Sequence, residues 1–179
     1  SIAFSPIKLE DLSGLSHEMI RDRLYESGLW PCIRRRPFSK IAEPNKLPKA
    51  IFIPAISTAP FGPDYNFIME NGSSGFQAGI NVLKKLADCV IHLIVDHKSD
   101  ALVFKEAENV ILHTFSGPHP SGNVGVHIFH IDPIENKDDI VWYVGLQDVM
   151  SIGKLFLNGK ADFTKIITMG GSSLQKRQY

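Results

Sequence analysis

A loop rich in Gly, Pro and His holds the residues whose chemistry is easiest to name. Over 115–130 the sequence reads FSGPHPSGNVGVHIFH, which joins an apolar strand to a helix. Glycines let the backbone come close to a ligand or a neighbouring segment, and the two prolines beside the first histidine of the loop restrict its conformation. Ligands bind at such loops in open α/β sheets. The candidate ligand-binding residues are therefore Gly117, His119, Gly122, Gly125 and His127.

A phosphate is one ligand that this loop could receive, because backbone N–H groups gather at the start of the helix that follows it. The loop lacks the Lys-Ser/Thr of a P-loop and the Gly-x-Gly-x-x-Gly spacing of a dinucleotide fingerprint. We therefore favour the interpretation of a rigid loop that shapes a surface.

Four histidines, His113, His119, His127 and His130, lie within eighteen residues, and imidazole is the commonest transition-metal ligand. No Cys, Asp or Glu stands at a spacing that would complete a metal site with them. We predict no metal and no catalytic residue here, and we expect the imidazoles to hold the loop through hydrogen bonds.

A second group of side chains suggests a contact with another protein. Arg34, Arg35 and Arg36 follow one another, and Trp30 and Phe38 flank them. Arg and aromatic residues are typical of interface anchors, so these five residues are the interface candidates. A nucleic-acid site is not expected, because no wider basic face accompanies the cluster and the 19 basic residues are balanced by 19 acidic ones.

The elements that must position these residues alternate between strands and helices. Apolar runs predict strands, periodic apolar residues predict helices, and Asp148 is interpreted as part of a helix start. The expected strands cover 50–55, 89–95, 110–115, 140–144 and 165–169, and the expected helices cover 16–28, 76–87, 99–107, 122–130 and a segment from 147. This order predicts an α/β fold with an open, mostly parallel sheet and helices on both faces.

The sequence also sets the domain organisation that we expect. Four prolines between 31 and 48 indicate a long connection, so we predict an N-terminal helix and connection over 1–48, an α/β domain over 49–171 and a C-terminal tail over 172–179. No apolar run is long enough to cross a bilayer. Two cysteines without Cys-x-x-Cys spacing argue against disulfides and fit a reducing cytosol.

Several separate motifs resemble the A subunit of the sodium-translocating NADH:quinone oxidoreductase. The matching words, in family order, are ESGLW (26–30), RPFSK (36–40), KAIFI (49–53), GPHPSG (117–122), VGVH (124–127) and QDVMSIGKLF (147–156). Members of that family are longer, so the resemblance implies that this chain is their central portion. It also implies a peripheral component on the cytoplasmic side of the bacterial inner membrane, bound to other subunits of the complex, above all to the membrane B subunit.

The family's central domain is similar in fold to the flavin- and NADH-binding subunit of complex I and to the C subunit of the Rnf complex, which implies a Rossmann-like architecture. In those relatives a glycine-rich loop after the opening helix cradles flavin phosphate. This chain has no glycine over 30–37, and the loop after its first predicted strand has no acidic residue before Asp64. We therefore expect that the flavin and NADH site has been lost and that this fragment binds no cofactor.

The resemblance also implies what the whole complex does. It uses NADH, flavins, ubiquinone and Na⁺, and it couples NADH oxidation by quinone to Na⁺ export as an NADH:ubiquinone reductase. For this domain we expect an assembly role without catalysis. Two alternatives stay open, a domain that itself binds ubiquinone or a nucleotide, and a free-standing soluble binding module.

Overall fold

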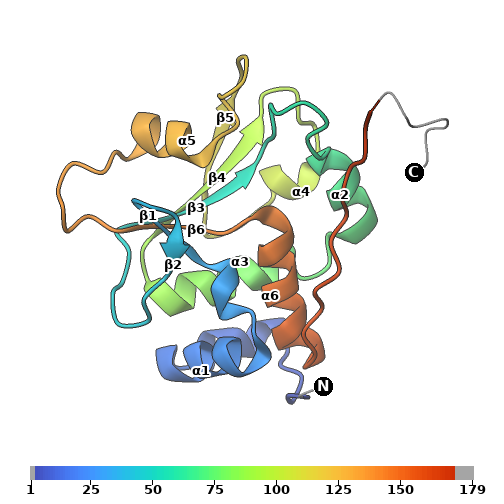
Figure 1. Ribbon diagram of the computed structural model, residues 1–179. Helices are drawn as coiled ribbons and strands as arrows, with labels where there is room; N and C mark the ends of the chain where they lie inside the picture. The colour runs from blue at the N-terminus through green and yellow to red at the C-terminus, as the bar shows by residue number, and fades with distance from the viewer. Residues whose placement is uncertain (1–2, 172–179) are drawn as a thin grey trace.

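The computed structural model describes residues 3–171, which form one six-stranded sheet with helices on both of its faces (Figure 1). The strands are β1 (Arg34–Arg36), β2 (Lys40–Ile41), β3 (Ala50–Ala55), β4 (Val90–Asp96), β5 (Ile111–Phe115) and β6 (Val141–Tyr143). The α-helices are α1 (His17–Ser27), α2 (Tyr65–Gly72), α3 (Phe76–Ala87), α4 (Leu102–Lys105), α5 (Val124–Ile131) and α6 (Leu146–Asn158). Two 3₁₀ helices, η1 (Leu9–Gly14) and η2 (Trp30–Cys32), complete the set.

The strand order places the centre of the sheet at β3. The order is β2-β1-β6-β3-β4-β5, in which β6, β3, β4 and β5 are parallel and β1 pairs antiparallel with both β6 and β2. The chain moves from β3 through β4 to β5 on one side and returns to form β6 on the other side of β3. The junction of β3 and β6 is therefore the topological switch point, where open α/β sheets bind their ligands.

The larger core lies on the face of the sheet that α1, α3 and α6 cover. Alternate strand residues point into it, among them Ile51, Leu93 and Trp142, and each is at most 1% exposed. The opposite face carries the other alternation, with Phe52 and Ile94 packed under α5. Successive side chains of a strand point to opposite faces of the sheet. A strand that is apolar at every position is therefore buried on both faces, and the prediction of helices on both faces is confirmed.

Backbone meets backbone where α3 packs on α6. A Cβ atom built on Gly79 would lie 2.1 Å from the carbonyl oxygen of Val149, and one built on Gly153 would lie 1.8 Å from that of Gly75. No larger residue fits at either glycine in this packing. We call this contact the glycine seam.

Most predicted elements are confirmed, and their ends follow from local chemistry. Ser16 caps α1 by accepting a hydrogen bond from the N–H of Met19, and Gly28 ends the helix with a left-handed φ of 78°. The α/β class and the mostly parallel sheet are confirmed as well. Helix α2 was not predicted from the sequence, although Asp64 caps it through hydrogen bonds from Asn66 and Phe67.

Two predicted elements need correction. The connection expected over 31–48 contains β1 and β2, so the arginine cluster lies in a strand of the sheet. The strand expected over 165–169 does not form, and the N–H and carbonyl of Ile166 bond to the Gln147 side chain of α6 instead of to a neighbouring strand. The tail predicted over 172–179 lies outside the described residues.

Candidate functional site

The predicted ligand loop is bound to the loop that follows β3. The hydroxyl of Thr58 accepts a hydrogen bond from the N–H of Gly122 at 2.9 Å and lies 3.3 Å from Nδ1 of His119. Both loops leave the carboxyl ends of parallel strands, so the sheet brings them together. Thr58 was missed in the sequence, although its position just after a predicted strand is the signal that could have identified it.

The three predicted glycines serve different ends in the loop. Gly117 has a φ of 144°, in the range that favours glycine. A Cβ on Gly122 would lie 2.7 Å from the backbone nitrogen of Thr58, so this glycine is required by close approach of two backbones. A Cβ on Gly125 would lie 2.9 Å from Nη2 of Arg36, which places that guanidinium against the first turn of α5.

His127 lies beneath the loop and is fully buried. Its Nε2 lies 2.8 Å from the carbonyl oxygen of Ser121, to which it donates, and the ring of Phe115 meets it edge-on at 4.8 Å. Nδ1 is buried and has no hydrogen-bond partner among the described residues. Burial lowers the pKa of His127, because a second proton on Nδ1 would have no acceptor.

The remaining histidines of this region do not converge with His127. His113 hydrogen-bonds with His92 of β4 through ring nitrogens 2.9 Å apart, and burial lowers the pKa of both. His130 is exposed beside Phe129. Within residues 3–171 no three His, Cys, Asp or Glu side chains are grouped so that they could hold a metal ion.

Trp30, one of the five interface candidates, has no surface to offer a partner. Its side chain is 1% exposed, its Nε1 donates to the carbonyl oxygen of Ala42 at 2.8 Å, and it stacks on Tyr25 with ring centroids 4.7 Å apart. We therefore correct its assignment as a contact residue. The apolar size that suggested an anchor belongs here to the core under β1, where Trp142 meets it edge-on.

The other four interface candidates lie in or beside the hairpin that β1 and β2 form. Arg34 donates to the carbonyl oxygen of Ser39 from Nε at 3.1 Å and Nη2 at 2.5 Å, and Arg35 pairs with Glu43 at 3.0 Å. Arg36 reaches the start of α5, and Phe38 at the tip is 79% exposed. Through Arg36, the hairpin and the glycine loop are neighbours, which their separation in the sequence did not predict.

The switch point itself holds a carboxylate of the chain. Asp148 lies in the first turn of α6, and a Cβ on Gly145, the N-cap residue, would lie 2.9 Å from its Oδ2. The negative charge therefore sits over the positive end of the helix, where a ligand phosphate would be favourable. Burial, together with the nearby Asp148 carboxylate, raises the pKa of the neighbouring Cys32 thiol to about 11.

A segment over 161–170, which we call the strap, covers this carboxylate. Lys165 pairs with Asp148 at 2.6 Å and contacts the Ser151 hydroxyl at 3.3 Å. The amide of Gln147 holds the strap backbone, since Oε1 accepts from the N–H of Ile166 at 2.8 Å and Nε2 donates to its carbonyl at 3.0 Å. Figure 1 shows the strap in red running beside α6 towards α2.

The strap also reaches the loop on the other side of the switch point. The Thr168 hydroxyl donates to the carbonyl oxygen of Phe61, in the loop between β3 and α2, and Gly170 lies against the Phe61 ring. The strap thus joins the first turn of α6 to the loop after β3. Gln147 and Asp148 were predicted at a helix start, but no partner was predicted for either.

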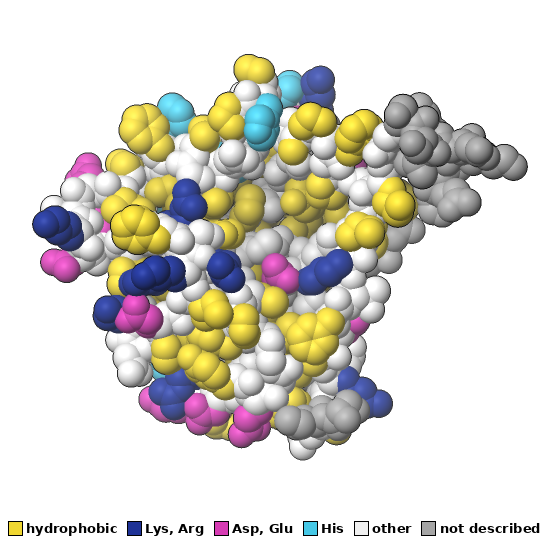
Figure 2. All heavy atoms as spheres, viewed as in Figure 1, with side chains coloured by type: hydrophobic (Ala, Val, Ile, Leu, Met, Phe, Trp, Pro, Cys, Tyr) yellow, Lys and Arg dark blue, Asp and Glu magenta, His cyan; other side chains and the backbone are white. Residues whose placement is uncertain are grey.

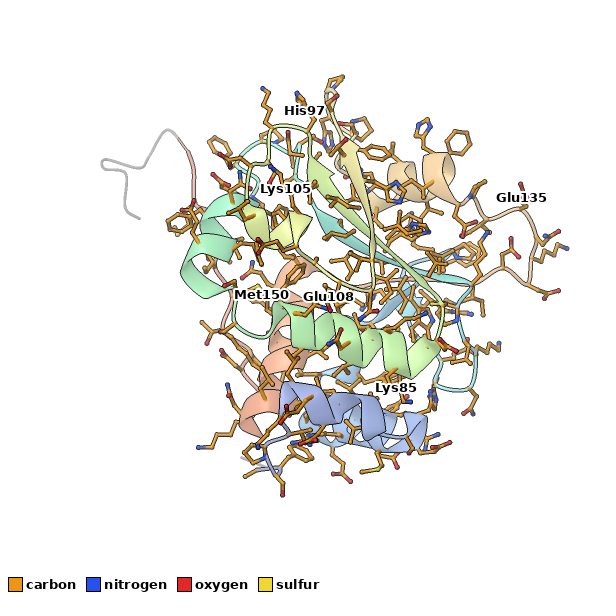
Figure 3. The ribbon with its side chains drawn as sticks, turned by 180° about the vertical axis from the view of Figure 1, so that it is seen from behind. Lys85, His97, Lys105, Glu108, Glu135 and Met150 are labelled. Carbon is orange, nitrogen blue, oxygen red and sulfur yellow. The ribbon has the colours of Figure 1, made fainter. Side chains whose placement is uncertain are left out.

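Two surface depressions lie elsewhere on the molecule. Their volumes are about 570 and 470 Å³, and both are lined by His17, Lys85 and Asp88. Figure 3 shows Lys85 at the C-terminal end of α3, near the amino end of β4. The two depressions contain none of the predicted site residues. They lie at the amino ends of the strands, whereas a switch-point ligand would bind at the carboxyl ends.

Among residues 3–171, no helix is both long and apolar enough for a bilayer crossing.

Comparison with known proteins gives consistent matches over nearly the whole chain. The family model described as "NqrA second alpha/beta domain" matches residues 15–161. A relative from Yersinia pseudotuberculosis serotype O:1b (strain IP 31758) is 38% identical over 176 residues, which is 98% of this chain and 39% of that protein. Relatives from Neisseria meningitidis serogroup B and Pasteurella multocida are 38% and 34% identical. All three are named as the A subunit of a Na(+)-translocating NADH-quinone reductase, and the chain spans 39% of the length of each.

Proposed function

The chain belongs to the family of the NqrA second alpha/beta domain, and on that premise we propose that it works as an assembly domain in the A subunit of a sodium-translocating NADH:quinone reductase. NADH oxidation by quinone, coupled to Na⁺ export, is then the activity of the assembled complex. Contact at the cytoplasmic face with the membrane B subunit is part of the same proposal and rests on the resemblance of the sequence motifs.

The observation that carries the proposal is the carboxylate at the switch point. In a dinucleotide-binding sheet a ligand phosphate lies at a helix start of this kind, stabilised by free N–H groups and the helix dipole. Here Asp148 occupies that position and Lys165 supplies its counter-charge at 2.6 Å. A phosphate would have to approach a carboxylate of equal sign and displace a lysine that is already paired.

The strap and the segment over 30–37 support the same conclusion. Gln147 binds the strap backbone at two points, so a ligand at this edge would compete with a segment of the same chain. Over 30–37 there is no glycine, and Trp30 fills the core instead of leaving bare backbone for a phosphate. These residues favour a domain without flavin or NADH.

A titration tests the loss of the ligand site. The purified chain is titrated with FMN, NADH and a short-chain ubiquinone, and heat release and Trp fluorescence are followed. We expect no saturable binding of any of the three at concentrations up to about 1 mM, which corresponds to affinities weaker than about −4 kcal/mol. Saturable binding at micromolar concentration would overturn this part of the proposal and would favour the alternative of a nucleotide- or quinone-binding domain.

Cross-linking of the purified reductase tests the assembly role. Lysines of this domain should form cross-links with other subunits, identified by mass spectrometry after digestion. The same lysines in the free chain serve as the control for reactivity. Reactive lysines that form no cross-link to the rest of the intact complex would contradict an assembly role.

A further inference from the structure

The tip of the hairpin between β1 and β2 has a backbone that does not suit its residues. Pro37, Phe38 and Ser39 join the two strands, and Phe38 and Ser39 have φ values of 74° and 51°. Tight hairpins with positive φ normally use Gly or Asn, because a bulky side chain is disfavoured there. Phe38 nevertheless occupies this position with 79% of its surface exposed.

A second exposed phenylalanine with positive φ, Phe61, is accounted for by contacts within the domain. Phe61 has a φ of 56° and is 68% exposed, but its carbonyl accepts from Thr168 and its ring lies against Gly170. The strap therefore accounts for Phe61. In the described part of the chain, the Phe38 ring makes no aromatic or cation–π contact and belongs to no apolar cluster, so packing within the domain does not account for Phe38.

The tip is held rigidly in spite of its exposure. Arg34 donates to the Ser39 carbonyl from two nitrogens, and the Ser39 hydroxyl is 2.6 Å from the hydroxyl of Tyr143 on β6. Arg34 thus braces the tip instead of facing a partner. A rigid aromatic side chain loses little conformational freedom when it is buried by another molecule, which favours tight contact.

The charge around the tip indicates what that other molecule carries. Residues 34–46 contain five Lys or Arg and one Glu, whereas the rest of the chain contains fourteen basic and eighteen acidic residues. Glu43 is shared by Arg35 and Lys46 at 3.0 and 2.8 Å, and Arg36 and Lys40 have no ion pair within residues 3–171. Figure 2 shows Lys and Arg side chains beside hydrophobic ones over this part of the sheet.

We propose that this hairpin is a docking element in which Phe38 inserts into an apolar pocket of another protein of the complex, while Arg36 and Lys40 face acidic residues on the rim of that pocket. The proposal rests on the assembly role proposed above. A single rigid ring with arginine neighbours matches a protein hot spot, whereas binding to a membrane surface needs a wider apolar face.

The test replaces Phe38 by Asn in the full-length A subunit. Asn tolerates positive φ, so the thermal midpoint of the purified chain should stay the same or rise, while its recovery with the other subunits at raised salt should fall about tenfold. Lys40→Glu should weaken recovery through charge alone. The controls are Phe129→Ala, which removes another exposed phenylalanine (69%), and Lys160→Glu, and both should leave recovery unchanged.

Three outcomes would overturn the proposal. Unchanged recovery of Phe38→Asn would remove the anchor, and a lowered thermal midpoint would assign Phe38 a structural role. Binding of the wild-type chain to phosphatidylglycerol vesicles, lost in Phe38→Asn, would assign the tip to a lipid surface. The titration described above separates the two proposals. If no cofactor binds and Phe38→Asn is recovered as well as wild type, only the docking proposal fails. Binding of FMN at micromolar concentration would count against the proposed function and not against the role of the hairpin.

Discussion

The loop over 116–123 and the β1–β2 hairpin differ in how their polar groups are satisfied. The loop has the composition of a binding site, yet its groups are used within the chain, since Gly122 and His119 bond to Thr58 and Ser121 bonds to His127 and Gly117. The hairpin was predicted as part of a connection that carries the interface candidates. It presents an exposed Phe38 with positive φ beside Arg36 and Lys40, which form no ion pair within residues 3–171.

This difference shows that the composition of a loop does not reveal whether its polar groups are free to bind a ligand. The Gly-rich sequence of the loop reflects a close approach of two backbones, and the second backbone is that of the loop after β3. A residue that conflicts with its own backbone geometry, such as Phe38, is the better indicator of a contact outside the domain. Three substitutions and a change of pH test whether the loop and the hairpin differ in this way.

The largest effect is expected from His127→Ala, which removes the buried ring and leaves the Ser121 carbonyl without its donor. We expect a loss of about 3 kcal/mol in the free energy of unfolding, measured by urea denaturation. Amide exchange should rise in the loop and stay constant in the hairpin. His130→Ala, at an exposed position of the same helix, is the control, and equal losses for both would show that the loop does not depend on His127.

A smaller loss is expected from Gly122→Ala. The added methyl group would lie 2.7 Å from the Thr58 nitrogen, so the two loops must separate, at about 2 kcal/mol. Gly14→Ala is the matched control, because nothing lies within 4 Å of a Cβ at Gly14. Thermal unfolding of both variants would distinguish the effects, and a wild-type midpoint for Gly122→Ala would mean that the loops are not closely packed.

The hydroxyl of Thr58 should contribute less than either of these. Thr58→Val keeps the shape of the side chain but removes the acceptor of the Gly122 N–H, at about 1 kcal/mol. Thr58→Ser retains the hydroxyl and should restore most of the loss in urea denaturation. If Thr58→Ser is as unstable as Thr58→Val, packing of the methyl group and not the hydrogen bond joins the two loops.

The smallest effect is expected from pH. The pKa of His127 is lowered by burial, so the folded protein resists a proton that the unfolded chain accepts below about pH 6.5. Stability should therefore be full above that pH and decline as the pH falls below it, with His92 and His113 acting in the same direction. His127→Gln should flatten part of the decline in thermal midpoints, and an unchanged slope would contradict a neutral, buried His127.

Local patterns in the sequence were sufficient for most of the fold. Ser16 and Gly28 defined α1, and the apolar run over 50–55 defined β3, because caps and burial on both faces of a strand are local properties. β1 could not be predicted in the same way, since its pairing of Arg35 with Trp142 depends on a distant strand. The run over 165–169 has the composition of a strand, but its hydrogen-bond partner is a side chain, Gln147.

The site was predicted less well than the fold, and the reasons are physical. The sequence located the glycine loop, but it could not show that Thr58 already satisfies it. Asp148 and Lys165 are seventeen residues apart, and their ion pair is visible only after α6 and the strap are placed. Trp30 was assigned to the surface because aromatic residues are common at interfaces, whereas its 1% exposure places it in the core.

The glycine seam between α3 and α6 has a mechanical consequence. Helices that touch through side chains can slide past each other in small shear steps, because side chains adjust their rotamers. Here the contact at Gly79 and Gly153 is backbone on backbone, so no rotamer can absorb such a step. Helices α3 and α6 should therefore move together as one rigid unit. Flexibility in this domain should be confined to its loops and to the ends of its sheet.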